Sequence, residues 1–109
     1  MIYELRTYWA MPGRLSDVHA RFRDHSIAIL ARHNMPLFGF WEPSPRTAES
    51  GDLVYILVHS DEAAMHANWA AFRADPDWIA ARDASEANGK IVARTASLVL
   101  TPTDYSPVK

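Results

Sequence analysis

The chain has 109 residues, of which 49% are hydrophobic and 22% charged, and its net charge is −2 at neutral pH. This length allows one domain, and this composition is typical of a globular protein rather than a disordered one. The absence of cysteine excludes a disulfide framework, a thiol nucleophile and a thiolate zinc site, and the acidic balance argues against nucleic acid or an anionic membrane as a partner. With no signal-peptide pattern and no apolar run near 18 residues, we expect a cytoplasmic protein.

The spacing of apolar residues predicts a first strand and a first helix. Residues Ile2–Trp9 alternate, so that even-numbered and odd-numbered positions point to opposite faces of a strand. After a turn at Pro12–Gly13, apolar residues recur every three or four positions over Arg14–His33, which predicts an amphipathic helix with its arginines and aspartates largely on the polar side. Asn34 is expected to end this helix in the left-handed conformation, and Pro36 prevents its continuation.

Two further strands are predicted on either side of a loop. Leu37–Glu42 is a strand rich in aromatic residues, and Pro43–Asp52 contains the prolines, serines and glycine of a loop. Leu53–His59 is the clearest strand of the chain, and its nearly continuous apolar run indicates that both of its faces are at least partly covered.

The second half of the chain begins with two helices. Ser60 or Asp61 can cap the first of them, whose apolar stripe includes Met65, Trp69 and Phe72. The pair Asp75–Pro76 ends that helix and starts another, with the aspartate as N-cap and the proline at the first helical position. We expect Gly89 to close the second helix as the residue just beyond its C-terminal cap.

A fourth strand over Ile91–Leu100 and an extended tail over Thr101–Lys109 complete the order β-α-β-β-α-β. This is the order of the ferredoxin-like split βαβ motif, in which right-handed crossovers place both helical segments on one face of the sheet. We therefore predict a single α+β domain over residues 1–109 with a four-stranded antiparallel sheet.

The sheet face away from the helices is expected to be apolar as well. If Val54, Ile56 and Val58 face the helices, large apolar residues are left to face outward. These are Leu53, Tyr55 and Leu57, joined by Ile2 and Tyr8 if Tyr3 and Leu5 point inward. Two such sheets packed face to face about a twofold axis would bury this surface, so we predict a homodimer, with a monomer that tolerates the exposed face as the alternative.

Several short strings carry a resemblance to a known family. They are Ile2–Tyr8, Pro12–Gly13, Gly39–Trp41, Tyr55, the stretch Trp69–Trp78 with its Asp-Pro break, and Pro102–Pro107. Together they resemble the NIPSNAP family of the dimeric α/β-barrel superfamily. The resemblance implies a ferredoxin-like protomer and a homodimeric barrel of two sheets. It implies no particular chemistry, because the family has no settled enzymatic activity.

The superfamily suggests where a ligand would bind and leaves three functions open. Sister families include cofactor-independent monooxygenases, haem-degrading monooxygenases, chlorite dismutase-like proteins and lactone isomerases, whose fold implies a pocket between sheet and helices or between the two sheets. The first hypothesis is a protein that binds a small aromatic or acidic organic ligand. The second is a cofactor-independent monooxygenase or isomerase, and the third is a structural or interaction protein whose tail wraps a partner.

Six residues are candidates for ligand binding, although none is assigned a catalytic role. Glu4 and Arg6 share one strand face and either form a structural ion pair or bind a substrate carboxylate or phosphate through the arginine fork. His59 is either a general base or an exposed residue. Trp69, Phe72 and Trp78 are better explained by core packing. The candidates are Glu4, Arg6, Tyr8, Trp41, Tyr55 and His59.

No metal site is predicted, because no pair of histidines has the spacing of a metal-binding motif. His25 and His33 lie eight positions apart in the first helix, near its apolar stripe. Such histidines can ligate haem, but they are more often residues at the boundary of a core. We therefore predict no cofactor and keep haem as a minor alternative.

Overall fold

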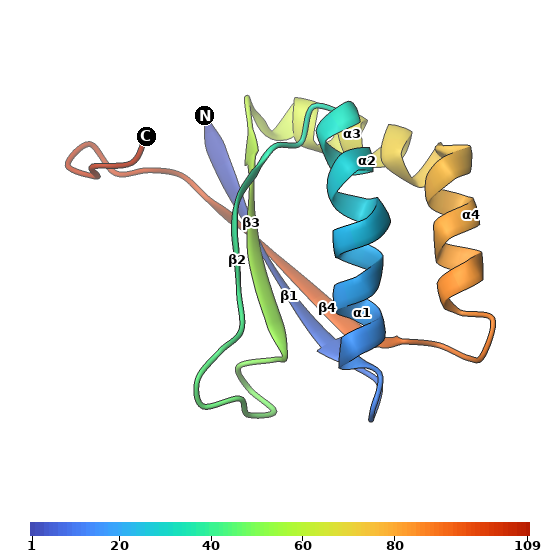
Figure 1. The fold of residues 1–109 in the computed structure, drawn as a ribbon. Helices are drawn as coiled ribbons and strands as arrows, with labels where there is room; N and C mark the ends of the chain where they lie inside the picture. Colours follow the sequence, from blue (N-terminus) through green and yellow to red (C-terminus); the bar gives the residue numbers. More distant parts are fainter.

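A computed structural model describes residues 1–109 of the chain. Its helices and strands follow the expected β-α-β-β-α-β order (Figure 1). They are β1 (Ile2–Ala10), α1 (Leu15–Arg21), a π-helical turn η1 (Phe22–Ser26), α2 (Ile27–Arg32), β2 (Leu37–Trp41), β3 (Leu53–His59), α3 (Glu62–Ala74), α4 (Pro76–Ser85) and β4 (Val92–Leu100). No helix combines the length and the apolar character needed to cross a membrane.

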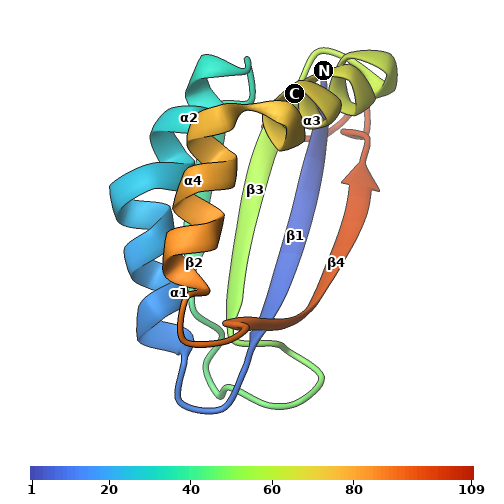
Figure 2. The same cartoon turned by 90° about the vertical axis from the view of Figure 1, so that its right-hand side faces the viewer.

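The four strands form one antiparallel sheet in the order β2-β3-β1-β4, which confirms the predicted ferredoxin-like fold. All helices lie on one face of this sheet, and no helix covers the other face (Figure 1). In the view from the helix side, α4 stands beside α1 and α2, and α3 lies across one end (Figure 2). The helices leave β4 uncovered on this side as well, so Thr95 and Ser97 are exposed there.

The predicted helix over residues 14–33 is continuous but contains the π-helical turn η1 in its middle. Four of its six buried residues, Val18, Phe22, Ser26 and Leu30, follow one another at intervals of four. A four-residue interval drifts around an α-helix of 3.6 residues per turn, and the wider turn reduces this drift, which keeps the four side chains over the sheet. Asn34 ends the helix with φ of 60°, as expected.

The helix caps of the second half follow the sequence signals in all but one case. The Asp61 side chain accepts a hydrogen bond from the Ala64 amide at the start of α3, and Asp75 accepts one from the Asp77 amide at the start of α4. The prediction for Gly89 is wrong, because α4 ends at Ser85, four residues earlier. The Ser85 hydroxyl donates to the Arg82 carbonyl at this end, a local side-chain bond that competes with continued helix.

The two faces of the sheet are the reverse of the assignment considered from the sequence. In the register of β1 and β3, Glu4 lies opposite Leu57 and Arg6 opposite Tyr55. Even-numbered residues of β1 and odd-numbered residues of β3 therefore face the helices. The buried residues of β3 are Leu53, Tyr55, Leu57 and His59, and Val54, Ile56 and Val58 face outward. Both sets are apolar, so hydrophobicity alone could not distinguish them.

The outward face is apolar in spite of this reversal. Exposed fractions there are 51% for Phe38, 48% for Trp41 and 57% for Leu98. The Trp41 ring lies over Gly39, where an added Cβ would come within 2.7 Å of the indole. The sheet thus has a second apolar surface, and no helix of this chain covers it (Figure 1). Monomers usually expose apolar residues singly, whereas here several lie together on one face.

Asp75 connects the end of α2 to the break between α3 and α4. The stability of the protein should therefore depend on the ionisation of this carboxyl group. The ion pair with Arg32, the hydrogen bond with His33 and the hydrogen bond from the Asp77 amide hold the pKa of the Asp75 carboxyl well below its ordinary value. A lowered folded-state pKa stabilises the protein above the unfolded-state pKa, near pH 4, and this stabilisation is lost as the pH falls further.

We therefore expect Asp75→Asn to lower the melting temperature at pH 7 and to lower it progressively less as the pH approaches 2. Thermal unfolding followed by circular dichroism across this range measures the difference. Asp83→Asn is the matched control, because Asp83 pairs only with the exposed Arg82 of its own helix. A difference for Asp75→Asn that stays constant with pH would contradict the expectation.

Candidate ligand site

A buried carboxylate lies at the centre of the helix-facing side of the sheet. Glu4 of β1 is only 2% exposed, and four side chains donate hydrogen bonds to it. Oε1 accepts from His59 Nε2 and Trp69 Nε1, each at 2.8 Å. Oε2 accepts from Ser97 Oγ at 2.6 Å and from Arg6 at 3.2 Å. Residues from β1, β3, α3 and β4 thus meet at one acidic group.

These contacts keep Glu4 ionised. Burial would raise the pKa of the Glu4 carboxyl, but the hydrogen bonds from Ser97, Trp69 and His59 and the charge of Arg6 lower it below its ordinary value. An ionised carboxylate only accepts hydrogen bonds, so His59 carries a proton on Nε2. Nδ1 of His59 is buried and has no hydrogen-bond partner.

Arg6 connects this carboxylate to two tyrosines. Its Nε donates to the Tyr55 hydroxyl at 2.8 Å, and the Tyr55 hydroxyl lies 3.3 Å from that of Tyr8. The guanidinium also stacks 4.4 Å from the centroid of a Trp69 ring. Burial would lower the pKa of Arg6, but Tyr55, Tyr8 and Glu4 raise it well above its ordinary value, so the guanidinium stays charged. Burial and the neighbouring Tyr8 raise the pKa of Tyr55.

A cavity of about 230 Å³ lies between this network and the helices, and we call it the arginine cavity. Its polar lining is dominated by arginines from four different elements, β1, α1, α3 and α4. They are Arg6, Arg21, Arg73 and Arg82. Six aromatic side chains form most of its walls. They are Tyr8, Phe22, Tyr55, Trp69, Phe72 and Trp78. No acidic side chain lines the cavity.

The arginines of the cavity are only partly neutralised. Arg21 is buried, pairs with Glu86 at 3.2 Å and lies 5.0 Å from the centroid of a Trp78 ring, while its Nε has no partner. Arg82 pairs with Asp83 outside the cavity, and Arg73 is exposed and has no acidic partner. The cavity is therefore positively charged and suits an anionic group.

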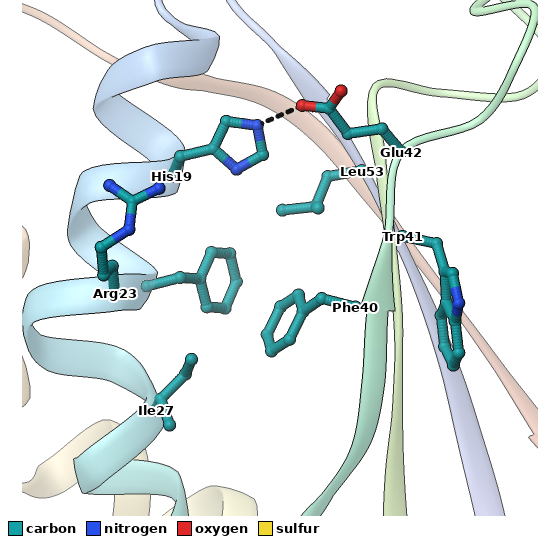
Figure 3. Close-up of a pocket in the computed structure, with 8 residues that line it drawn as sticks. His19, Arg23, Ile27, Phe40, Trp41, Glu42 and Leu53 are labelled. Carbon is teal, nitrogen blue, oxygen red and sulfur yellow. Dashed lines mark hydrogen bonds and ion pairs between the residues drawn. The ribbon is translucent and has the colours of Figure 1, made fainter.

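A second hollow lies between α1 and the edge strand β2, and we call it the α1–β2 groove. It measures about 300 Å³ and is lined by apolar residues that include Ile27, Phe40 and Leu53. Figure 3 shows His19 and Glu42 reaching across it from the helix and the strand, with 2.6 Å between His19 Nε2 and Glu42 Oε1. Polar groups converge in the arginine cavity rather than in this more open groove, so we place the primary site in the cavity.

The structure brings five of the six predicted site residues together. Arg6, Tyr8 and Tyr55 line the arginine cavity, and Glu4 and His59 lie behind Arg6 in the same hydrogen-bond network. His59 is buried and does not line the cavity. The remaining candidate, Trp41, does not join them. It is among the residues that line the α1–β2 groove, but its ring points away from that space and lies over Gly39 on the outer face of the sheet (Figure 3).

Sequence reasoning missed the helical half of the site. Arg21 was expected on the polar side of its helix but is buried against Trp78. No prediction from the sequence concerns Arg73 or Arg82, and Trp78 is assigned to core packing. The only local signal is the Asp-Pro break, which brings α3 and α4 into contact and so places these side chains around one space.

The histidines outside the network have other partners or none. His33 contacts Asp75 at 2.6 Å, and His25 is exposed on η1. The structure contains no group of three or more histidine, aspartate or glutamate side chains arranged to hold a metal ion.

Solved structures share this fold. An uncharacterized NIPSNAP domain protein from Burkholderia xenovorans is 22% identical, with a TM-score of 0.81 over 98% of this chain and 99% of that one. A NIPSNAP family protein from Agrobacterium tumefaciens is 19% identical, with a TM-score of 0.84 over 99% and 98%. An antibiotic biosynthesis monooxygenase is 11% identical, with a TM-score of 0.60 over 94% and 99%. At these identities the likeness shows the fold alone.

The family follows from the sequence match. None of the curated proteins compared with the chain matches it. The model of the NIPSNAP family matches residues 3–107, which confirms the resemblance carried by the strings in β1, β2, the Asp-Pro break and the tail. The chain belongs to the NIPSNAP family.

Proposed function

We propose that this NIPSNAP protein binds a small aromatic acid in the arginine cavity and acts as a homodimer in the cytoplasm. One observation carries the proposal for the ligand: four arginines and six aromatic side chains surround a space that no acidic residue lines. An aryl carboxylate meets both requirements. Its acid group can pair with a guanidinium through two parallel hydrogen bonds, and its ring can stack on the aromatic walls.

The Tyr8 hydroxyl adds a donor for the same acid group. The Tyr55 oxygen accepts from Arg6, so the buried Tyr55 hydroxyl has the Tyr8 oxygen as the acceptor for its own proton. Tyr8 then keeps its proton for a ligand. The size of the cavity also fits, because about 230 Å³ equals the space of roughly eight water molecules at about 30 Å³ each, enough for one ring with a small acidic group.

The outer face of the sheet supports the homodimer. Phe38, Trp41, Leu98 and Leu100 are exposed on it, next to Tyr3 and Leu5 of β1. Burial of apolar surface contributes about 25 cal/mol per Å², so a second copy packed on this face would stabilise both sheets. The fold of the structural relatives is compatible with this arrangement.

Catalysis is the alternative function, and the fold shared with an antibiotic biosynthesis monooxygenase supports it. Arg6 and Tyr8 could stabilise negative charge that develops on a substrate oxygen, as a cofactor-independent monooxygenase or an isomerase requires. However, neither a histidine nor a carboxylate is among the lining residues that could act as a general base. The geometry therefore favours binding. A purely structural role, with the tail contacting a partner, remains the third proposal.

The ligand proposal predicts that benzoate binds to the protein much more tightly than its neutral analogue benzamide. Isothermal titration of the wild-type protein with both compounds measures the difference. The double variant Arg73→Met, Arg82→Met should bind benzoate about tenfold more weakly or worse, because a charge-assisted hydrogen bond contributes about 1.5–3 kcal/mol. Lys90→Met is the control, since Lys90 is exposed and does not line the cavity. Equal binding of benzoate and benzamide would contradict the proposal.

The buried network predicts a large loss of stability for Glu4→Gln. The amide group would place two N–H donors against donors from Arg6 and Ser97 and remove the charge that Arg6 requires. We expect the free energy of unfolding in urea to fall by about 3–5 kcal/mol. Glu42→Gln, at an exposed pair, should change it by less than about 0.5 kcal/mol. Similar losses for both variants would show that the network is not a stabilising unit.

The dimer proposal predicts that Leu98→Lys produces monomers. Leu98 lies on the outer face opposite Leu5, and a charge there would be buried by a second sheet. Light scattering at micromolar concentration should give twice the chain mass for the wild-type protein and the mass of one chain for the variant. Ile79→Lys changes an exposed apolar residue on α4, on the helix side, and should leave the mass unchanged. A monomeric wild-type protein would refute the proposal.

A further inference from the structure

One aromatic side chain is shared by the arginine cavity and the α1–β2 groove. Phe22 lines both spaces. The centroid of its ring lies 5.0 Å from that of Phe40, which lines the groove. It also lies 5.3 Å from the Tyr8 ring and 5.1 Å from the Tyr55 ring, both of which line the cavity. The Phe22 ring therefore stands between the two spaces, beside the Phe40 and Tyr55 rings, which stack on each other at 4.7 Å.

This partition lies at a special point of the backbone. Phe22 is the first residue of η1, the π-helical turn between α1 and α2. Such turns are rare inside α-helices and frequently occur at functional sites. The turn places Arg21 and Ser26 on the arginine cavity, Arg23 and Ile27 beside the groove, and Phe22 on both.

The two spaces differ in chemistry in a complementary way. The arginine cavity presents guanidinium groups to a ligand, as described above. The groove presents Ile27, Phe40 and Leu53 along its walls, and its polar groups Arg23, His19 and Glu42 lie around these apolar side chains (Figure 3). One end of the combined space would bind an anion, and the other end an apolar group.

We propose that the cavity and the groove are two halves of one binding site for a biaryl-type acid. The acid group and first ring lie in the arginine cavity, and a second apolar ring extends past a displaced Phe22 side chain into the α1–β2 groove. The acidic half of this proposal rests on the proposed function. The apolar half rests on separate observations, those on the groove and on Phe22, and it gives both a role in ligand recognition.

The test compares benzoate with biphenyl-4-carboxylate, which adds one ring at the far end of the same acid. Isothermal titration of the wild-type protein should give an affinity for the biphenyl acid at least about tenfold higher, because the second ring is buried in the groove. Ile27→Gln makes the exposed groove wall polar and should remove most of this gain while leaving the affinity for benzoate unchanged. Ile79→Gln, at an equally exposed isoleucine outside both spaces, should change neither affinity.

Phe22→Ala removes the partition and should further raise the affinity for the biphenyl acid without raising that for benzoate. Because Phe22 is buried in the core, this variant can fail to fold, and Ile27→Gln then decides the question. Absence of benzoate binding to the wild-type protein would overturn the proposed function. Benzoate binding without a gain for the biphenyl acid, or a gain that Ile27→Gln leaves intact, would overturn the two-part site alone.

Discussion

The ionised Glu4 carboxylate, held below the helices by four donors, is the interaction on which the rest of the structure depends. It lies in the central strand β1, and its partners come from both neighbouring strands and from α3. A buried charge of this kind is tolerated only when it is fully hydrogen-bonded. The same carboxylate orients Arg6, whose guanidinium forms the floor of the arginine cavity, so the stability of the fold and the charge of the site come from one network.

This network also explains the orientation of the sheet. An alternating strand can turn either set of residues inward, and β3 is apolar on both faces. The choice is made in β1, where Glu4 and Arg6 must find partners. His59 of β3 and Ser97 of β4 share their sheet face in either orientation, but Trp69 of α3 is available only on the helix side. The outer face keeps the residues that need no polar partner, and it is therefore more uniformly apolar than the inner one.

The order of strands and helices could be predicted from the sequence because it depends on local signals. Alternation in β1 and β3, the left-handed Asn34 and the Asp-Pro break each fix an element boundary without reference to distant residues. The inner half of the site could be predicted for the same reason, since spacing within a strand places Glu4 and Arg6 on one face. The helical half could not. The positions of Arg21, Arg73 and Arg82 depend on how α3 and α4 pack on α1 and on the wider turn at η1, which no local pattern reveals.

Helix α4 buries little apolar surface, and this affects how the molecule opens. Ala81 is its only buried residue, whereas α3 buries Met65, Trp69 and Phe72. A helix with so little apolar burial detaches in local fluctuations at a lower free energy than the sheet requires to unfold. Because α4 also supplies two side chains to the arginine cavity, the same fluctuation would admit and release ligands. In amide hydrogen exchange, α4 would then be the fast-exchanging segment of the domain, and an occupied cavity would slow it.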